Sequence, residues 1–467
     1  MKTFLDRSFL LENLVGEELY FSAASNLPII DFHNHLDPYA LAVNTRPESI
    51  GDLWVVSDPY KHRAMRINGV PEHFVSGKAS AEEKFRFWAA TLPKTIGNPL
   101  FHWSCAELKY VFGIENMLNE RNAKEIWDIC NKILAEKDWG ARDLLKIWGT
   151  EVVCTSDDLL DDLSTHVQAT RNGEGLKVLP SLRGDSMLSF CTPGYLPWLE
   201  RLQAGFGKID SLDHYQQAII QCLDVFQEAG CLLADHSLDA GFSFVETGLF
   251  EAEHIFKCIL KAQVVSEQEL VMIRSYLLSF LGVEYAKRGW TLQLHIGAQR
   301  RTSSRLRSLA GAAGGYACIG KACDVDSLCR FLDTLESAGH LPNLILYTLN
   351  PADNAVLATL TGSFAEDHIA GKVQFGPAWW YNDFMEGIRQ QLSALSGYGL
   401  LSRFVGMTTD SRSILSFSRH DYFRRILCNM LGTWVEKGYV PHEPELLQQM
   451  VKDICYLNSK KMIENKK

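Results

Sequence analysis

The sequence has no excess of positive charge and no long apolar run. Its 46 Lys and Arg residues are outnumbered by 56 Asp and Glu residues, which gives a formal net charge of −10 at pH 7. Nucleic-acid binding needs a basic face, so we expect no nucleic-acid partner. No uncharged apolar stretch approaches the ~18 residues of a membrane span. The N-terminal segment is interrupted by Asp6, Arg7 and Glu12 and lacks the apolar region of a signal peptide.

Paired cysteines and nucleotide-binding motifs are also missing. None of the twelve cysteines forms a CxxC pair. Cys318, Cys323 and Cys329 come closest to a cluster, but their spacing fits no zinc knuckle. We therefore expect twelve reduced thiols in a cytoplasmic protein. Because neither G-x-G-x-x-G nor a P-loop pattern occurs, we expect no nucleotide cofactor.

The 467 residues do contain eight short apolar or β-branched runs, most of them ending in polar residues. Near-continuous apolar character is typical of strands that are buried on both faces of a parallel sheet. Helix-like stretches lie between most of the runs, which indicates βα units. We predict an α/β fold, a (β/α)8 barrel, although a doubly wound sheet can also hold eight strands. The runs span residues 27–33, 151–157, 177–183, 231–236, 291–297, 343–350, 372–378 and 403–410.

The first gap between runs is unusually long and has no convincing strand. Its helix-like segments carry enough tryptophan for a local core, at Trp88, Trp103, Trp127, Trp139 and Trp148. We predict a helical insertion after strand one. The expected domains are an N-terminal segment with barrel strand 1 (1–36), a mainly helical insertion that covers the barrel mouth (37–149), and the rest of the barrel with C-terminal helices (150–467).

Candidate metal ligands follow the first run. A barrel of this kind carries its active site at the carboxyl ends of its strands. His33 and His35 lie two residues apart, so on an extended strand they point to the same side. Together with His295 and Asp410 at other strand ends, they predict one divalent metal ion, for which zinc fits the imidazoles and carboxylate best. The alternative is a pair of hydrogen-bonded loop histidines.

Further polar residues follow the other runs. Asp410 can be a ligand, a proton acceptor or merely a helix N-cap. Arg183 and Arg412 can each make bidentate contacts with a carboxylate substrate, or form structural ion pairs. Asp-His at 235–236 is either a carboxylate–histidine pair or two capping residues. The pair Trp379 and Trp380 is more typical of packing than of recognition.

Several longer segments carry a family resemblance. They are HNHLDP at 33–38, DPYKHRAMRINGV at 58–70, EVVCTSDD at 151–158, QLHIGAQR at 293–300 and FVGMTTDSRSILSFSRHDYFRRILCNMLG at 404–432. In consistent order from about residue 24 to the C-terminus, the sequence resembles the uronate isomerases, the glucuronate isomerase branch of the amidohydrolase superfamily.

This resemblance implies an amidohydrolase-type barrel and isomerisation of D-glucuronate to D-fructuronate and of D-galacturonate to D-tagaturonate. It implies a metal at His33 and His35, with Asp410 near the ion and His295 in the site. It implies catalytic or substrate roles for Tyr60, Arg183, Asp410 and Arg412. Two features depart from the family pattern. Pro59 stands where members often have histidine, and Ser-Leu-Arg-Gly-Asp at 181–185 replaces an expected Arg-Pro-Asp.

An aldose–ketose isomerase needs a base over C2, stabilisation of the enediolate oxygens and a clamp on the C6 carboxylate. We assign Asp410 as the base, with Tyr60 and His295 near the C1 and C2 oxygens. We assign substrate binding to Arg183, Arg412, Tyr60, Trp379 and Trp380.

Two other functions compete with this interpretation. A metal-dependent hydrolase would use the same barrel, but the strand-four segment has no lysine that could bridge two metals. A sugar-acid binding protein is the third possibility, and a secreted one would need a signal peptide. We expect hexuronates as the small-molecule partners and a homo-oligomeric assembly.

Overall fold

The computed structural model describes residues 3–464. Its centre is a curled, all-parallel sheet of seven strands in the order β1-β2-β3-β4-β5-β8-β9. Every residue of β1 and β5 is buried, because both faces of the sheet are covered. The strands are β1 (Ile29–Asn34), β2 (Thr150–Asp158), β3 (Lys177–Arg183), β4 (Leu233–Leu238), β5 (Thr291–Ile296), β8 (Asn343–Thr348) and β9 (Val373–Phe375).

The run at 403–410 was predicted as a regular eighth strand, and that prediction is wrong. The segment lies against β1, where the Asp410 N–H donates to the His33 carbonyl at 3.0 Å. Two positive φ angles, +87° at Gly406 and +47° at Asp410, interrupt its extended backbone. The His33 N–H donates to the Thr408 hydroxyl instead of to a backbone carbonyl. A curled seven-stranded sheet is therefore observed, and the closed eight-stranded barrel stays a prediction.

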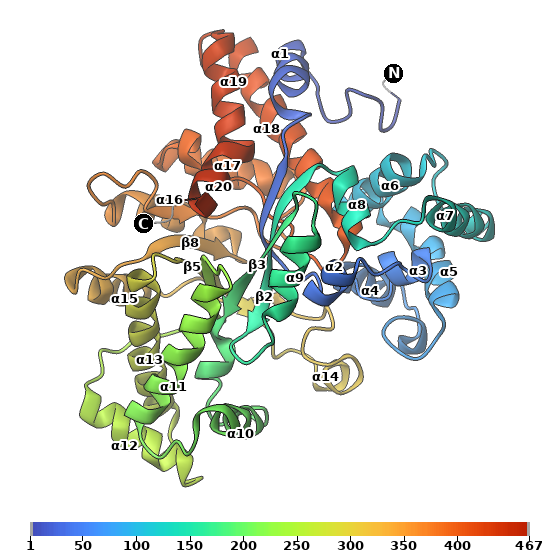
Figure 1. Ribbon diagram of the computed structural model, residues 1–467. Coiled ribbons are helices and arrows are strands. Elements are labelled where there is room, and N and C mark those ends of the chain that lie inside the picture. Colours follow the sequence, from blue (N-terminus) through green and yellow to red (C-terminus); the bar gives the residue numbers. More distant parts are fainter. Residues whose placement is uncertain (1–2, 465–467) are drawn as a thin grey trace.

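The chain between β1 and β2 is helical, without a strand. Its interior is aromatic, because Trp54, Phe85 and Trp88 are fully buried and Trp103 nearly so. Figure 1 shows α3 to α7 gathered at one side of the sheet, far from α10 to α13. The helices are α2 (Pro38–Val43), α3 (Ile50–Trp54), α4 (Pro59–Ile67), α5 (Ala81–Thr91), α6 (Pro99–Phe112), α7 (Ala123–Lys137) and α8 (Ala141–Ile147), with 3-10 turns at Glu72–Phe74 and Leu92–Thr95.

The remaining helices surround the sheet, and α1 (Leu14–Leu19) packs against α18 (Ser418–Glu436), which joins the two ends of the chain (Figure 1). In residues 3–464 no helix is long and apolar enough to cross a membrane. The others are α9 (Ser164–Asn172), α10 (Tyr195–Phe206), α11 (Leu212–Glu228), α12 (Leu249–Leu260), α13 (Glu267–Lys287), α14 (Ser304–Ala310), α15 (Val325–Ser337), α16 (Asn354–Ser363), α17 (Met385–Tyr398), α19 (Pro444–Lys452) and α20 (Asn458–Glu464).

Short elements complete the fold. A two-stranded antiparallel ribbon pairs β6 (Ala298–Gln299) with β7 (Cys318–Ile319) just beyond β5. The 3-10 turns are Gly184–Leu188, Pro351–Asp353, Leu401–Arg403 and Ile414–Phe417, and π-helical turns occupy Tyr20–Ala24 and Asp453–Leu457.

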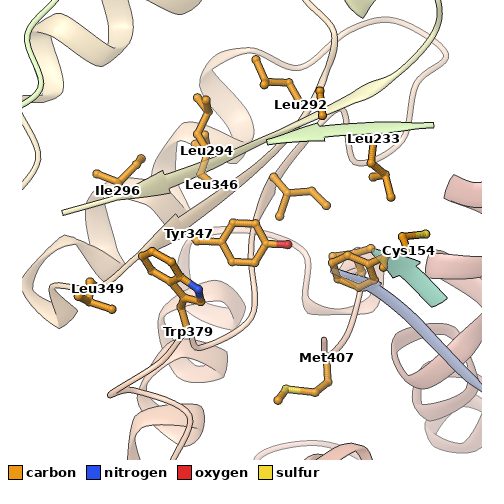
Figure 2. Close-up of a cluster of buried hydrophobic side chains, with 14 of the residues drawn as sticks. Cys154, Leu233, Leu292, Leu294, Ile296, Leu346, Tyr347, Leu349, Trp379 and Met407 are labelled. Carbon is orange, nitrogen blue, oxygen red and sulfur yellow. The ribbon is translucent and has the colours of Figure 1, made fainter. Parts of the chain in front are cut away.

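The core of the sheet is apolar up to the floor of the site. Figure 2 shows Leu292, Leu294 and Ile296 of β5 among the buried apolar side chains, with Tyr347 of β8 and Trp379 beyond β9 side by side. The Tyr347 hydroxyl donates to Gln293 Oε1 at 2.6 Å. This bond satisfies a buried polar group that would otherwise destabilise the core.

Candidate active site

One cavity lies at the carboxyl ends of the strands, and it gathers residues from most of the chain. It includes side chains from β1, β3 and β5, from the start of α4, from the loops after β6 and β9, and from the irregular segment after Gly406. The nine side chains to which the sequence analysis assigns a site role all line it. They are His33, His35, Tyr60, Arg183, His295, Trp379, Trp380, Asp410 and Arg412.

The two histidines that follow β1 converge on Asp410. Nε2 of His35 lies 3.0 Å from Asp410 Oδ1, and Nε2 of His33 lies 3.3 Å from the same oxygen. Their potential ligand atoms all fall within 4.8 Å of one another. Nε2 of His295 is buried without a hydrogen-bond partner, and its ring centroid is 4.6 Å from that of His33. Two imidazoles, a carboxylate and one unpaired imidazole nitrogen nearby are a donor set that fits one divalent ion.

Asp410 is held as a carboxylate by its neighbours. Burial raises its pKa, but hydrogen bonds from His33 and His35 outweigh burial and hold the pKa well below its usual range. Trp379 Nε1 donates to its second oxygen at 2.6 Å. Both oxygens are therefore engaged, and the side chain is ionised near neutral pH.

Asp31 of β1 fixes the segment that carries Asp410. Asp31 is fully buried and accepts hydrogen bonds from the Thr408 hydroxyl at 3.0 Å and from the Thr409 N–H at 2.8 Å. Nε2 of His420 on α18 lies 2.9 Å from Asp31 Oδ2. These side-chain contacts replace the regular ladder of an eighth strand.

Asp235 links two of the predicted residues beneath the cavity. Its Oδ1 lies 3.6 Å from His295 Nδ1 and 3.7 Å from Arg183 Nη1. Burial raises the pKa of Asp235, but Arg183 and then His295 lower it below its usual range. Burial lowers the pKa of His295 to about 4, so its imidazole is neutral near pH 7. Arg183 also pairs with Asp185 at 2.9 Å, so it forms structural ion pairs while lining the cavity.

The sequence left the Asp235-His236 pair open, and the structure separates the two residues. Adjacent strand residues point to opposite sides. Asp235 faces the site, whereas His236 Nε2 lies 2.8 Å from the Tyr285 hydroxyl of α13. A Cβ at Gly184 would lie 2.0 Å from the His236 ring, so glycine is required there. His236 therefore belongs to the layer between sheet and helices.

Tyr60 reaches the cavity from the first turn of α4. Asp58 caps this helix by accepting from the N–H groups of Tyr60 and Lys61, and Pro59 takes the N1 position that proline favours. The glycine-rich stretch at 303–320 contains α14 and β7 and packs on the same turn. A Cβ at Gly315, whose φ is +76°, would lie 2.3 Å from the Pro59 carbonyl oxygen.

The predicted tryptophans and Arg412 occupy different parts of the cavity. Trp379 is buried and stacks on His295, with ring centroids 4.7 Å apart. Trp380 packs edge-on against Trp379, and the Arg300 guanidinium lies 5.6 Å from its ring centroid. Arg412 is exposed at the cavity surface.

Sequence reasoning missed four charged residues around the cavity. Arg63, three residues after Tyr60, donates to the Tyr381 hydroxyl at 3.1 Å, and Arg300 donates to Asp239 at 2.9 Å. Asp383 and Arg419 surround Tyr60 and are described below. Arg300 and Arg419 fall inside the segments that carry the family resemblance, which is a signal that could have found them. Arg63 also lies in such a segment. Asp383 lies in none of them, and its only signal in the sequence is that it follows Trp379 by four residues.

Comparison with known proteins decides the family. A family model described as glucuronate isomerase matches residues 1–463. The chain belongs to this family. A uronate isomerase from Caldanaerobacter subterraneus is 44% identical over 462 residues, covering 98% of this chain and 99% of that protein. A uronate isomerase from Bacillus licheniformis is 43% identical, covering 98% of this chain and 97% of that protein.

Solved structures agree with this membership of the glucuronate isomerase family. The crystal structure of a uronate isomerase from Thermotoga maritima has a TM-score of 0.93 and 29% identity, covering 99% of this chain and all of that one. A putative metal-dependent hydrolase from Lactobacillus casei, at 12% identity and a TM-score of 0.53, shares the fold alone.

Proposed function

We propose that this protein is a uronate isomerase that converts D-glucuronate to D-fructuronate and D-galacturonate to D-tagaturonate. The observation that carries the proposal is the cavity itself, in a chain that matches the family along nearly its whole length. An ionised carboxylate, a neutral imidazole and four arginines meet there. Those groups are what an enediolate route between aldose and ketose requires.

Asp410 is the base that removes the proton from C2 of the open-chain sugar. Its ionised state and its position on the cavity wall support this role. The same carboxylic acid then returns the proton to C1. His33, His35 and Trp379 fix its two oxygens, so the base stays in one orientation during the transfer.

Tyr60 and His295, which line the same cavity as Asp410, bind the C1 and C2 oxygens of the sugar. A neutral His295 can exchange hydrogen bonds with these oxygens, and its Nε2 has no competing partner. The C6 carboxylate is bound by Arg183 and Arg412, with Trp380 against the sugar. In a chain of net charge −10, local arginines are what attract an anionic substrate.

His33, His35 and Asp410 would hold one divalent metal ion, with zinc the best match to their donor atoms. When bound, such an ion polarises sugar oxygens as a Lewis acid.

The helices between β1 and β2 form a separate unit over the cavity mouth, which their contribution of Tyr60 supports. Segment 404–411 closes the sheet as an irregular eighth member. Cytoplasmic location and homo-oligomeric assembly stay predictions.

An NMR assay of the purified protein with D-glucuronate and D-galacturonate tests this function. We expect resonances of the two ketoses to grow without any nicotinamide cofactor. Parallel incubations with an N-acyl amide and a lactone test the hydrolase alternative. Hydrolysis of either compound without ketose formation would contradict the proposal.

A further inference from the structure

Tyr60 makes one hydrogen bond that the isomerase proposal does not use. Its hydroxyl donates to Asp383 Oδ2 at 2.8 Å. Asp383 is 4% exposed and lies in the loop between β9 and α17, so the bond joins the insertion to the sheet. Arg419 of α18 lies 3.7 Å from the same carboxylate oxygen.

The Tyr60 ring is held in place by stacked side chains. The Arg419 guanidinium lies 4.7 Å from the ring centroid of Tyr60 and 4.1 Å from that of Trp103. Tyr60 and Trp103 also meet edge-on at 5.8 Å. With the ring fixed, the direction of the hydroxyl proton is the remaining freedom of this side chain.

Tyr60 and Asp383 stand in a wall between two cavities. The active-site cavity and a second cavity share Tyr60, Arg63 and Tyr381 in their lining. Asp383 lines only the second cavity, together with Lys94. Tyr60 therefore borders both cavities, while Asp383 borders only the second cavity, through which it can exchange a proton with water.

An ionised carboxylate only accepts hydrogen bonds, so it forces the Tyr60 proton to point away from the site. We propose that Asp383 is a positioning residue that sets the Tyr60 hydroxyl as a hydrogen-bond acceptor toward a substrate hydroxyl and takes up its proton. The inference rests on the proposed isomerase function. It assigns a task to a residue outside the predicted site.

The chemistry needs such a group, because isomerisation moves two protons. Asp410 moves one between C2 and C1, and the other must leave O2 and reach O1. As the O2–H bond breaks, its proton bonds to Tyr60 Oη while the original Tyr60 proton bonds to Asp383. The reverse shift delivers a proton from Tyr60 to O1. Both side chains return to their starting states, and no further reactant is needed.

The electrostatic surroundings of Asp383 suit reversible proton uptake. Burial raises its pKa to about 6, although Arg419 and the hydrogen bond from Tyr60 act in the opposite direction and Asp410 adds to the rise. Asp383 is therefore ionised above about pH 6 and protonated below it. Arg63 and Lys94 are the other charged groups that line the second cavity with it.

A substrate-free NMR titration tests the positioning role directly. In protein labelled at tyrosine Cζ, the Tyr60 resonance is assigned by its loss in Tyr60→Phe. We expect this resonance to shift with a midpoint near pH 6 in the wild type, following protonation of Asp383. Asp383→Asn should abolish the shift. A Tyr60 resonance that ignores pH in the wild type, or titrates unchanged in Asp383→Asn, would overturn the proposal.

Glu107→Gln is the matched control. Glu107 is also buried, and its charge acts on Arg419, but its hydrogen bonds come from Trp54 and Ser418. We expect Glu107→Gln to keep the Tyr60 titration. Loss of the titration in both variants would assign the effect to the charge network as a whole and contradict a specific role for Asp383.

Kinetics supply the second readout. Asp383→Asn should lower kcat about 10²-fold with little change in KM, and the fall in activity below about pH 6 should disappear. Adding Tyr60→Phe to Asp383→Asn should lower kcat only a little further, because both changes break the same Tyr60–Asp383 hydrogen bond. If the two changes lower kcat by fully additive amounts, Tyr60 and Asp383 do not act as a pair. If the wild type isomerises no hexuronate, the proposed function fails, while the titration still decides the Tyr60–Asp383 relation.

Discussion

At the scale of single residues, Asp410 is the group on which the proposed chemistry depends. Asp410→Asn keeps the size of the side chain but cannot accept the C2 proton. We expect kcat to fall by at least ~10²–10⁴-fold with a much smaller change in KM, because we assign the carboxylate clamp to the arginines. Steady-state kinetics check this, with circular dichroism to confirm the fold. Near-wild-type turnover would remove Asp410 from the role of base.

His33 and His35 are two of the three residues that we propose to bind the metal ion. The double variant His33→Ala/His35→Ala removes two of three convergent donors, so elemental analysis should show clear loss of bound divalent metal. His254→Ala is the control, because His254 is exposed and lies outside the cavity lining. Equal metal content in the double variant and the wild type would mean that the histidines are structural.

Arg412 should act on binding rather than on turnover. Arg412→Met removes a charged donor at the cavity surface, and a charge-assisted hydrogen bond contributes ~1.5–3 kcal/mol. We expect KM for D-glucuronate to rise by roughly 10- to 100-fold, with a smaller change in kcat. Arg301→Met, a change at an exposed arginine outside the cavity lining, should leave KM unchanged. A KM equal to that of wild type in Arg412→Met would exclude the clamp.

At the scale of elements, the contact between the glycine-rich stretch and α4 positions Tyr60. Gly315→Ala and Gly311→Ala both place a side chain at positive φ, but only at Gly315 would the new Cβ meet the Pro59 backbone. Each change carries the backbone strain of a non-glycine residue at positive φ, about 1–3 kcal/mol. We expect Gly315→Ala to cost more stability in urea unfolding and to lower kcat as well. Equal effects of the two variants would show that the contact does not matter.

Strand positions were largely predictable from the sequence, because buried parallel strands are short apolar runs. The eighth apolar run does not form the predicted strand, and the reason is local. Thr408 and Asp31 satisfy each other through side chains, and the positive φ at Gly406 and Asp410 breaks the strand. Apolar character alone carries no signal for either effect.

The candidate site was predictable where its residues follow strands. His33, His295 and Asp410 could be brought together because parallel strands end at one edge. Asp383 and Arg419 could not, because a loop and a distant helix meet Tyr60 only through tertiary packing. The sequence also did not determine which side of the sheet Asp235 faces, since a strand that is buried on both faces shows no alternation of polar and apolar residues.

At the scale of the whole molecule, the strand ends and the irregular segment beside β1 supply the proposed base and metal ligands, while the helices between β1 and β2 supply Tyr60. The Tyr60–Asp383 bond and the stacking of Arg419 join the two parts across the cavity. We therefore propose that both parts enclose the open-chain sugar and keep water away from the reacting atoms.

The most direct test of proton transfer through an enediolate is isomerisation of D-glucuronate in D₂O, followed by NMR at C1 of the ketose. We predict D-fructuronate with deuterium at C1, increasing with repeated turnover, as Asp410 exchanges its proton with solvent. The Asp410→Asn variant should form ketose, with or without deuterium, far more slowly than the wild type. Ketose that stays free of deuterium after prolonged turnover would indicate a hydride shift and contradict the account.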